Sequence, residues 1–169
     1  MDTLFVMNPQ NSFFSNEGRI YMGDKAEVLR VRLIDLFSRF NKEIIFFREV
    51  HATEDKFFTT DKTHSVANTP DSFIHKDFKK FGQTTIIKTR YNAFFGTVLE
   101  DILLKRNLNH IGIVGVETHT SVLFTAEELR NRGYEVTVIE PCVMSRDDYL
   151  HSSAITLMRH SLGVRITNE

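Results

Sequence analysis

Short apolar runs alternate with amphipathic stretches along this chain. The runs at residues 3–7, 43–47, 84–88, 111–114 and 135–139 each have the length of a buried strand. Between them, apolar residues recur at helical spacing over residues 23–41, 99–107, 118–131 and 146–158, and a short strand follows at 164–166. This alternation predicts an α/β fold, namely a three-layer α/β/α sandwich around a parallel, Rossmann-like sheet of about six strands.

The strand, helix and strand over residues 111–139 form the most informative part of the pattern. A βαβ unit places chemistry where the carboxyl end of a strand meets the next helix. Here that junction is residues 115–121, and Ser121 lies in the first helical turn, near backbone N–H groups at the positive end of the helix dipole. By contrast, residues 53–81 are polar with scattered aromatics, which predicts an extended connection with at most a short helix.

Composition describes an ordinary globular chain. Its 169 residues are 41% hydrophobic and 25% charged, which predicts one domain over residues 1–169. The net charge of -1 gives no basic excess for nucleic acid, and no apolar run approaches the length of about 18 residues that a membrane span needs. The single cysteine, Cys142, excludes an internal disulfide and is predicted to be a small buried hydrophobe. Because the chain begins directly with a strand, we expect a cytoplasmic protein, although an organelle reached without a cleaved signal stays open.

The βαβ junction also carries a family resemblance. Residues 115–122 read Gly-Val-Glu-Thr-His-Thr-Ser-Val, and Thr-Ala and Gly-Tyr pairs follow at residues 125–126 and 133–134. This pattern resembles the signature of isochorismatase-like cysteine hydrolases. Its Glu and His resemble the branch called isochorismatase domain-containing proteins.

Two further motifs extend the resemblance over nearly the whole chain. Residues 88–97 match the family pattern Lys…Ser-Ala-Phe-x-Gly-Thr, with Asn92 in the serine position, where it is expected to cap the helix that follows. After the first strand, Gln10, Asn11 and Phe13 match the family's Asp-Met-Gln-Asn-Asp-Phe. The resemblance implies the isochorismatase-like hydrolase fold.

The family site contains Asp, Lys and Cys, and the matching positions here hold Asn8, Lys88 and Ser121. In the family the Asp accepts the thiol proton and the Cys attacks the substrate. A carboxamide neither takes nor gives a proton near neutral pH, and a serine hydroxyl is far less acidic than a thiol with its pKa of about 8.5. We therefore expect a hydrolase homologue with lost or impaired family activity, which binds a small molecule or a partner.

Two alternatives stay open from the sequence. Ser121 and Lys88 could act as nucleophile and base on amides or esters, provided that Lys88 is neutral and lacks a carboxylate partner. Asn8 in place of Asp would remove that partner. The other alternative is a structural subunit of a homo- or hetero-oligomer. Both replacements are nearly isosteric, so a decayed site and a site altered by design to trap a ligand are further explanations.

The resemblance implies additional features around the site. A cis peptide between Val116 and Glu117 would aim N–H groups at the pocket as an oxyanion hole, formed by Val116, Glu117 and Ser121. The residues expected to wall the pocket are Phe13, Phe14, Tyr91, Phe94, Thr118 and Thr120.

Metal, cofactor and partner expectations complete the analysis. Glu49 and His51 echo the metal site of nicotinamidases, which are relatives in this family, but His64 is the only other candidate nearby. Two loose ligands do not fix an ion, so we predict no metal and no cofactor. The expected partners are a small-molecule ligand and a second copy of the chain. The 15 phenylalanines indicate more apolar surface than a monomer needs, which predicts a homo-oligomer.

Overall fold

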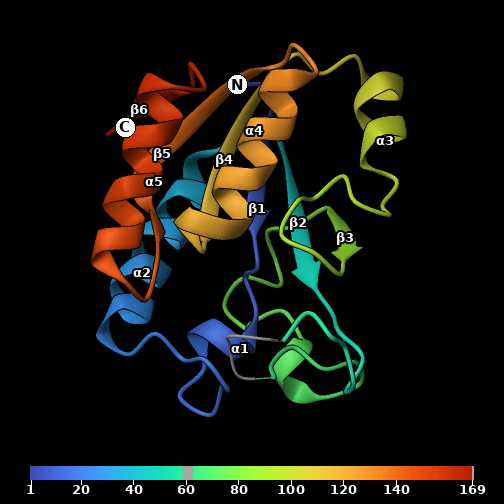
Figure 1. Ribbon diagram of the computed structural model, residues 1–169, viewed down its shortest axis with the longest axis vertical. Helices are drawn as coiled ribbons and strands as arrows, with labels where there is room; N and C mark the ends of the chain where they lie inside the picture. The colour runs from blue at the N-terminus through green and yellow to red at the C-terminus, as the bar shows by residue number, and fades with distance from the viewer. Residues whose placement is uncertain (59–62, 169) are drawn as a thin grey trace.

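Six strands form one parallel sheet in the computed structural model, which describes residues 1–58 and 63–168 (Figure 1). The order across the sheet is β3-β2-β1-β4-β5-β6, and every neighbouring pair is parallel. The strands are β1 (Thr3–Met7), β2 (Glu43–Glu49), β3 (Thr84–Lys88), β4 (His110–Val116), β5 (Glu135–Met144) and β6 (Arg165–Thr167). This confirms the predicted parallel sheet and places the final strand at its edge.

Helices cover both faces of the sheet. They are α1 (Asn11–Phe14), α2 (Asp24–Arg39), α3 (Leu99–Arg106), α4 (Leu123–Asn131) and α5 (Asp148–His160), with a 3-10 turn η1 (Pro70–Ser72) and a π-helical turn η2 (Thr118–Val122). α4 and α5 lie in front of the sheet in Figure 1, and α2 lies behind it. The predicted three-layer sandwich is therefore confirmed.

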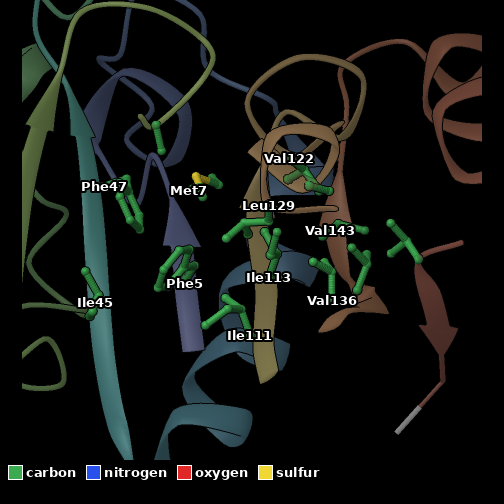
Figure 2. Packing of buried hydrophobic residues seen from close by; sticks show 14 of the residues in the cluster. Phe5, Met7, Ile45, Phe47, Ile111, Ile113, Val122, Leu129, Val136 and Val143 are labelled. Carbon is green, nitrogen blue, oxygen red and sulfur yellow. The ribbon is translucent and has the colours of Figure 1, made fainter. Parts of the chain in front are cut away.

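The side chains of each central strand alternate between two apolar cores. Leu4 and Val6 of β1 pack with α2, whereas Phe5 and Met7 pack with β4, β5 and α4 on the other face. Figure 2 shows the second core, in which Phe5 and Ile113 are completely buried. Each such side chain contributes roughly 1.5–3 kcal/mol when it leaves water. Parallel strands that are covered on both faces need continuous apolar runs, and for this reason the central strands could be recognised in the sequence.

The helix predicted at residues 118–131 differs from the structure in its first turn. Residues Thr118–Val122 form a π-helical turn, in which the Val122 N–H donates to the Glu117 carbonyl at 3.2 Å, and the α-helix starts at Leu123. The side chains of Thr118 and Ser121 both have partners on other elements, so this wider turn is anchored from two sides. Single π-helical turns of this kind are frequent at functional sites.

Two other local predictions were wrong. Asn92 does not cap α3, because its Oδ1 accepts from the Phe94 N–H at 2.9 Å and closes a local turn instead. Val28 and Leu104 belong to the apolar spacing that predicted the helices at residues 23–41 and 99–107, but both side chains are exposed. The buried stripe of α2 is narrower than expected and consists of Ala26, Leu29, Leu33 and Phe37.

The prediction for Cys142 is confirmed. β5 continues past Pro141, and the Cys142 thiol is buried against α2. Burial raises the pKa of this thiol to about 11, so it is an inert thiol at neutral pH. Within residues 1–58 and 63–168, every helix is too short or too polar to cross a membrane.

Candidate functional site

Three polar side chains meet where β1, β3 and β4 end. Lys88 Nζ donates to Ser121 Oγ at 3.1 Å, and Asn8 Nδ2 donates to the same oxygen at 3.1 Å. All three residues are at least 98% buried, with Ser121 completely so. The structure thus brings together Asn8, Lys88 and Ser121, although they lie far apart in the sequence.

A fourth residue, Glu49, was missing from the site predicted by sequence. It ends β2 directly beside Lys88 of β3, and Lys88 Nζ donates to Glu49 Oε2 at 2.7 Å. The expectation that Lys88 lacks a carboxylate partner is therefore wrong. The sequence did contain one signal for this role of Glu49. Ile45, Phe47 and Glu49 alternate along β2 and share one face of it, so the Glu49 carboxylate lies at the strand end on the side of the site.

The electrostatics of this pair favour two charged groups. Burial alone would raise the pKa of the Glu49 carboxyl, but the Lys88 ammonium and hydrogen bonds from His51 and His64 hold that pKa well below its usual value. Burial lowers the pKa of the Lys88 ammonium, and Glu49 opposes this shift. Because each charge stabilises the other, we take the buried Lys88–Glu49 ion pair as intact at neutral pH.

The Asn8 amide is oriented by Glu49. An ionised carboxylate only accepts hydrogen bonds, so Asn8 turns its Nδ2 toward Glu49 Oε2, at 3.3 Å. Its Oδ1 is buried and has no hydrogen-bond partner within the described part of the chain. An unsatisfied buried acceptor costs about 1–3 kcal/mol, and a ligand that donates to it would recover that free energy.

The Gln10 side chain stabilises the position of Glu49 through hydrogen bonds to the backbone. Its Nε2 donates to the Glu49 carbonyl at 2.8 Å and to the Ser72 carbonyl at 2.9 Å, while its Oε1 accepts from the Glu49 N–H at 2.6 Å. One amide therefore ties the segment after β1 to the end of β2 and to η1. Gln10 positions the Glu49 backbone, a role that its place in the family motif did not reveal.

The predicted cis peptide between Val116 and Glu117 is present. The Glu117 carboxylate does not face Ser121 but pairs with Arg146, whose Nη2 donates to Oε2 at 2.9 Å and whose Nε donates to Oε1 at 3.0 Å. Thr118 is also engaged elsewhere, since its Oγ1 hydrogen-bonds with His151 Nδ1 at 2.9 Å. The proposed oxyanion hole therefore rests on the backbone of Val116, Glu117 and Ser121 alone.

The other expected wall residues divide between the site and the core. Phe13 lies edge-on to His64 at 5.9 Å between ring centroids, close to the Glu49 cluster. Phe14 instead packs against Phe78 in the α2 core, because the short helix α1 turns it away from the sheet end. Its assignment to the pocket wall was wrong.

The expected wall residues after β3 also divide between the surroundings of the site and the core. The Tyr91 ring contacts Phe57, at 4.7 Å between ring centroids, and Phe124, at 6.0 Å, and Phe57 in turn stacks on His51. Phe94 lies under the Arg132 guanidinium at 4.4 Å and packs on the core that contains α4, so it does not wall the pocket. Thr120 is half-buried and its N–H donates to the Glu117 carbonyl at 3.2 Å.

A possible metal cluster lies against the far side of Glu49. The ligand atoms of Glu49, His51 and His64 all lie within 4.8 Å of one another, and all three residues are buried. Glu49 Oε1 is 2.8 Å from His51 Nε2 and 3.2 Å from His64 Nε2. The description as loose ligands is wrong, because the chain returns beside β2 and the His51 N–H donates to the Ser65 carbonyl.

The donor set fits a divalent transition-metal ion. Two imidazoles and a carboxylate are typical zinc ligands, and His51 Nδ1 lies 3.2 Å from Asp55 Oδ2, an outer partner that orients the ring. Glu49, His51 and His64 would hold the ion, which would supply a Lewis acid on the side of Glu49 away from Lys88. The other oxygen of Glu49 is the one that pairs with Lys88.

We expect Co²⁺ to produce visible ligand-field absorption when added to metal-free protein. His64→Ala should weaken binding by at least about tenfold, because it removes one of three donors. His160→Ala, at an exposed position of α5, is the matched control and should bind Co²⁺ as the unmodified protein does. Equal affinities in the two variants would contradict this assignment.

Comparisons with known proteins agree with the fold and with the motifs. A family model described as the isochorismatase domain matches residues 2–169. The uncharacterized isochorismatase family protein YaaI of Bacillus subtilis is 34% identical over 84 residues, which cover 50% of this chain and 46% of YaaI. Isochorismatase domain-containing protein 2 of Xenopus laevis is 25% identical over 160 residues, which cover 88% of this chain and 75% of that protein. The crystal structure of nicotinamidase PncA from Bacillus subtilis superposes with a TM-score of 0.90 at 22% identity, covering 99% of both chains.

Proposed function

Because the chain belongs to the isochorismatase family, we propose that it binds a small molecule beside Asn8, Lys88 and Ser121 without performing the family's Asp and Cys chemistry. One observation carries this proposal. Both side chains that contact Ser121 Oγ are placed as hydrogen-bond donors, and although burial lowers the pKa of Lys88, Glu49 opposes this shift and stabilises the ammonium. Neither contact can take the hydroxyl proton, so the serine is not activated as a nucleophile.

The same contacts favour a ligand. Asn8 Oδ1 is an acceptor without a hydrogen-bond partner among the described residues. The three N–H groups of Lys88, by contrast, are already used by Glu49 Oε2, the Arg90 carbonyl and Ser121 Oγ. A molecule with an N–H or O–H donor would therefore match Asn8, while Gln10 and Glu117 are already satisfied by structural partners.

The test is a pH–rate profile on a panel of p-nitrophenyl esters. We expect the unmodified protein to be no faster than Ser121→Ala at any pH between 6 and 9. A rate that rises with an apparent pKa of about 7–8, and that is lost in Ser121→Ala, would contradict the proposal.

The alternative function, an amide or ester hydrolase that uses Ser121 with Lys88, is supported by one distance. Lys88 Nζ is 3.1 Å from Ser121 Oγ, which is within reach for proton transfer. This mechanism needs a neutral Lys88, and Glu49 opposes that state. In that case the unmodified protein would already be active, and Lys88→Ala would abolish the rate measured in the same assay.

We also propose a homo-oligomer, which is compatible with a structural role for the chain. Large apolar side chains are exposed on β3, on α3 with the segment before it, and on α4, namely Ile87, Phe95, Val98, Leu104 and Phe124. β3 and α3 lie on the same side of the molecule in Figure 1. Light scattering at micromolar concentration is expected to give at least twice the chain mass, and a mass of 19.6 kDa would contradict this expectation.

A further inference from the structure

Successive residues of β2 point to opposite faces of the sheet. Glu49 faces the site, so Arg48 faces the α2 side together with Phe46. On that face Arg48 pairs in register with Ile87 of β3, which is 54% exposed. The described connection between β2 and β3 contains only the short turn η1 and no α-helix, so this corner of the sheet lacks a helical cover.

A cavity of about 340 Å³ occupies this corner. Arg48 and Lys79 line it, and none of its lining residues is acidic. Phe46 and Phe73 provide aromatic surface, and Thr85 comes from the edge strand. A Cβ on Gly82 would lie 2.5 Å from the Phe46 ring, so this glycine lets the loop lie flat against the cavity floor.

The Arg48 guanidinium has no anionic partner within the part of the chain that the structure describes. It lies 5.7 Å above the Phe73 ring, its Nε is buried without an acceptor, and it forms no ion pair with any residue that the structure describes. Lys79 likewise forms no ion pair among those residues. Arg30, by comparison, is paired with both Glu27 and Asp77. A partly buried arginine normally has such an acceptor, because an orphaned charged donor is costly.

We propose that this cavity is an anion-binding site, distinct from the site around Ser121. Its ligand is a small organic anion, with a carboxylate or phosphate group on an aromatic or similar apolar body. The charged group accepts hydrogen bonds from the planar guanidinium of Arg48, which suits both oxyanions, and lies near the Lys79 ammonium. The apolar body lies on Phe73, which is 42% exposed. The volume is large enough for a molecule of this size.

The test uses nitrogen-15 NMR of the full chain with phenyl phosphate, benzoate, inorganic phosphate and neutral benzamide as probes. Phenyl phosphate and benzoate should shift the Arg48 Nε–Hε signal in a saturable way, and benzamide should not. The backbone amides of Gly82 and Thr85 report binding in the variants. Arg48→Gln should weaken phenyl phosphate binding by about tenfold or more, whereas Arg48→Lys, which keeps the charge, should lose less.

Arg39→Gln is the control for lost surface charge, because Arg39 is exposed and pairs with Asp35 on α2, and it should bind the probes normally. An unchanged affinity in Arg48→Gln, or an Arg48 signal that does not respond, would overturn the proposal. Inorganic phosphate binding as tightly as phenyl phosphate would contradict the role of the aromatic surface. Ser121→Ala should leave all these affinities unchanged, so the result is independent of the function proposed above.

Discussion

The double substitution Asn8→Asp with Ser121→Cys is expected to give a thiol that iodoacetamide alkylates at least about tenfold faster than the thiol of Ser121→Cys alone. The new carboxylate at position 8 would stand where Asn8 Nδ2 now lies, 3.1 Å from the Ser121 oxygen and 3.3 Å from Glu49 Oε2. Two neighbouring carboxylates raise the pKa of one of them, which suits a proton acceptor near neutral pH. General-base assistance typically contributes about 10²–10⁴-fold.

The comparison between these two variants removes the effect of burial. Position 121 is equally enclosed in both, so any difference in alkylation comes from the proton acceptor. Cys142 serves as the internal reference, since its pKa of about 11 keeps it protonated. Hydrolysis of small primary amides should be detectable in the double variant only. Equal alkylation rates in the two variants would show that position 8 does not control this site.

Lys88→Met is expected to lower the free energy of unfolding by about 3–5 kcal/mol, because it leaves the Glu49 carboxylate buried without its cation. The pair is completely enclosed, with side-chain exposures of 0% and 2%. Combining Lys88→Met with Glu49→Gln should recover part of the loss, since no uncompensated charge then remains. Urea unfolding at pH 7 measures the free energy of unfolding of the unmodified protein, of Lys88→Met and of the double variant.

The control is Lys42→Met, which removes an exposed ion pair with Asp2 and should change stability little. The pH dependence provides a second criterion. Glu49 has a lowered pKa in the folded state, so its contribution is present above its ordinary pKa of 4.5 and is lost as the pH falls through the folded value. This acid-dependent loss should become smaller in Lys88→Met, and an unchanged dependence would contradict the assigned pairing.

The parts of the fold that follow from local pattern were predictable. A strand buried on both faces requires a continuous apolar run, so β1, β2 and β4 could be located from sequence to within a few residues. The π-helical turn was not predictable, because it depends on partners that Thr118 and Ser121 find on β3 and α5. The prediction that Asn92 caps α3 failed for a similar reason, because its side-chain oxygen accepts a hydrogen bond within a turn that precedes the helix.

The candidate site was predictable only where a motif and a strand end coincide. Asn8, Lys88 and Ser121 satisfy both conditions. The partnership of Glu49 with Lys88 needs the register between β2 and β3, and the approach of His64 to His51 needs the return path of a long loop. Neither quantity is encoded in residue spacing. The same holds for the environment of Arg48, because it depends on which described helices cover this corner of the sheet.

The strand order has a consequence for how the protein folds and responds to ligands. The residues around Ser121 come from four adjacent strands, and Asn8 and Ser121 are 113 residues apart in sequence. Contacts of such separation form late, after the chain entropy of the long loops has been lost. No smaller folding unit contains the whole site. A ligand bound there should therefore slow the hydrogen exchange of those sheet amides that exchange only through global unfolding, including amides far from Ser121, because global unfolding destroys the site.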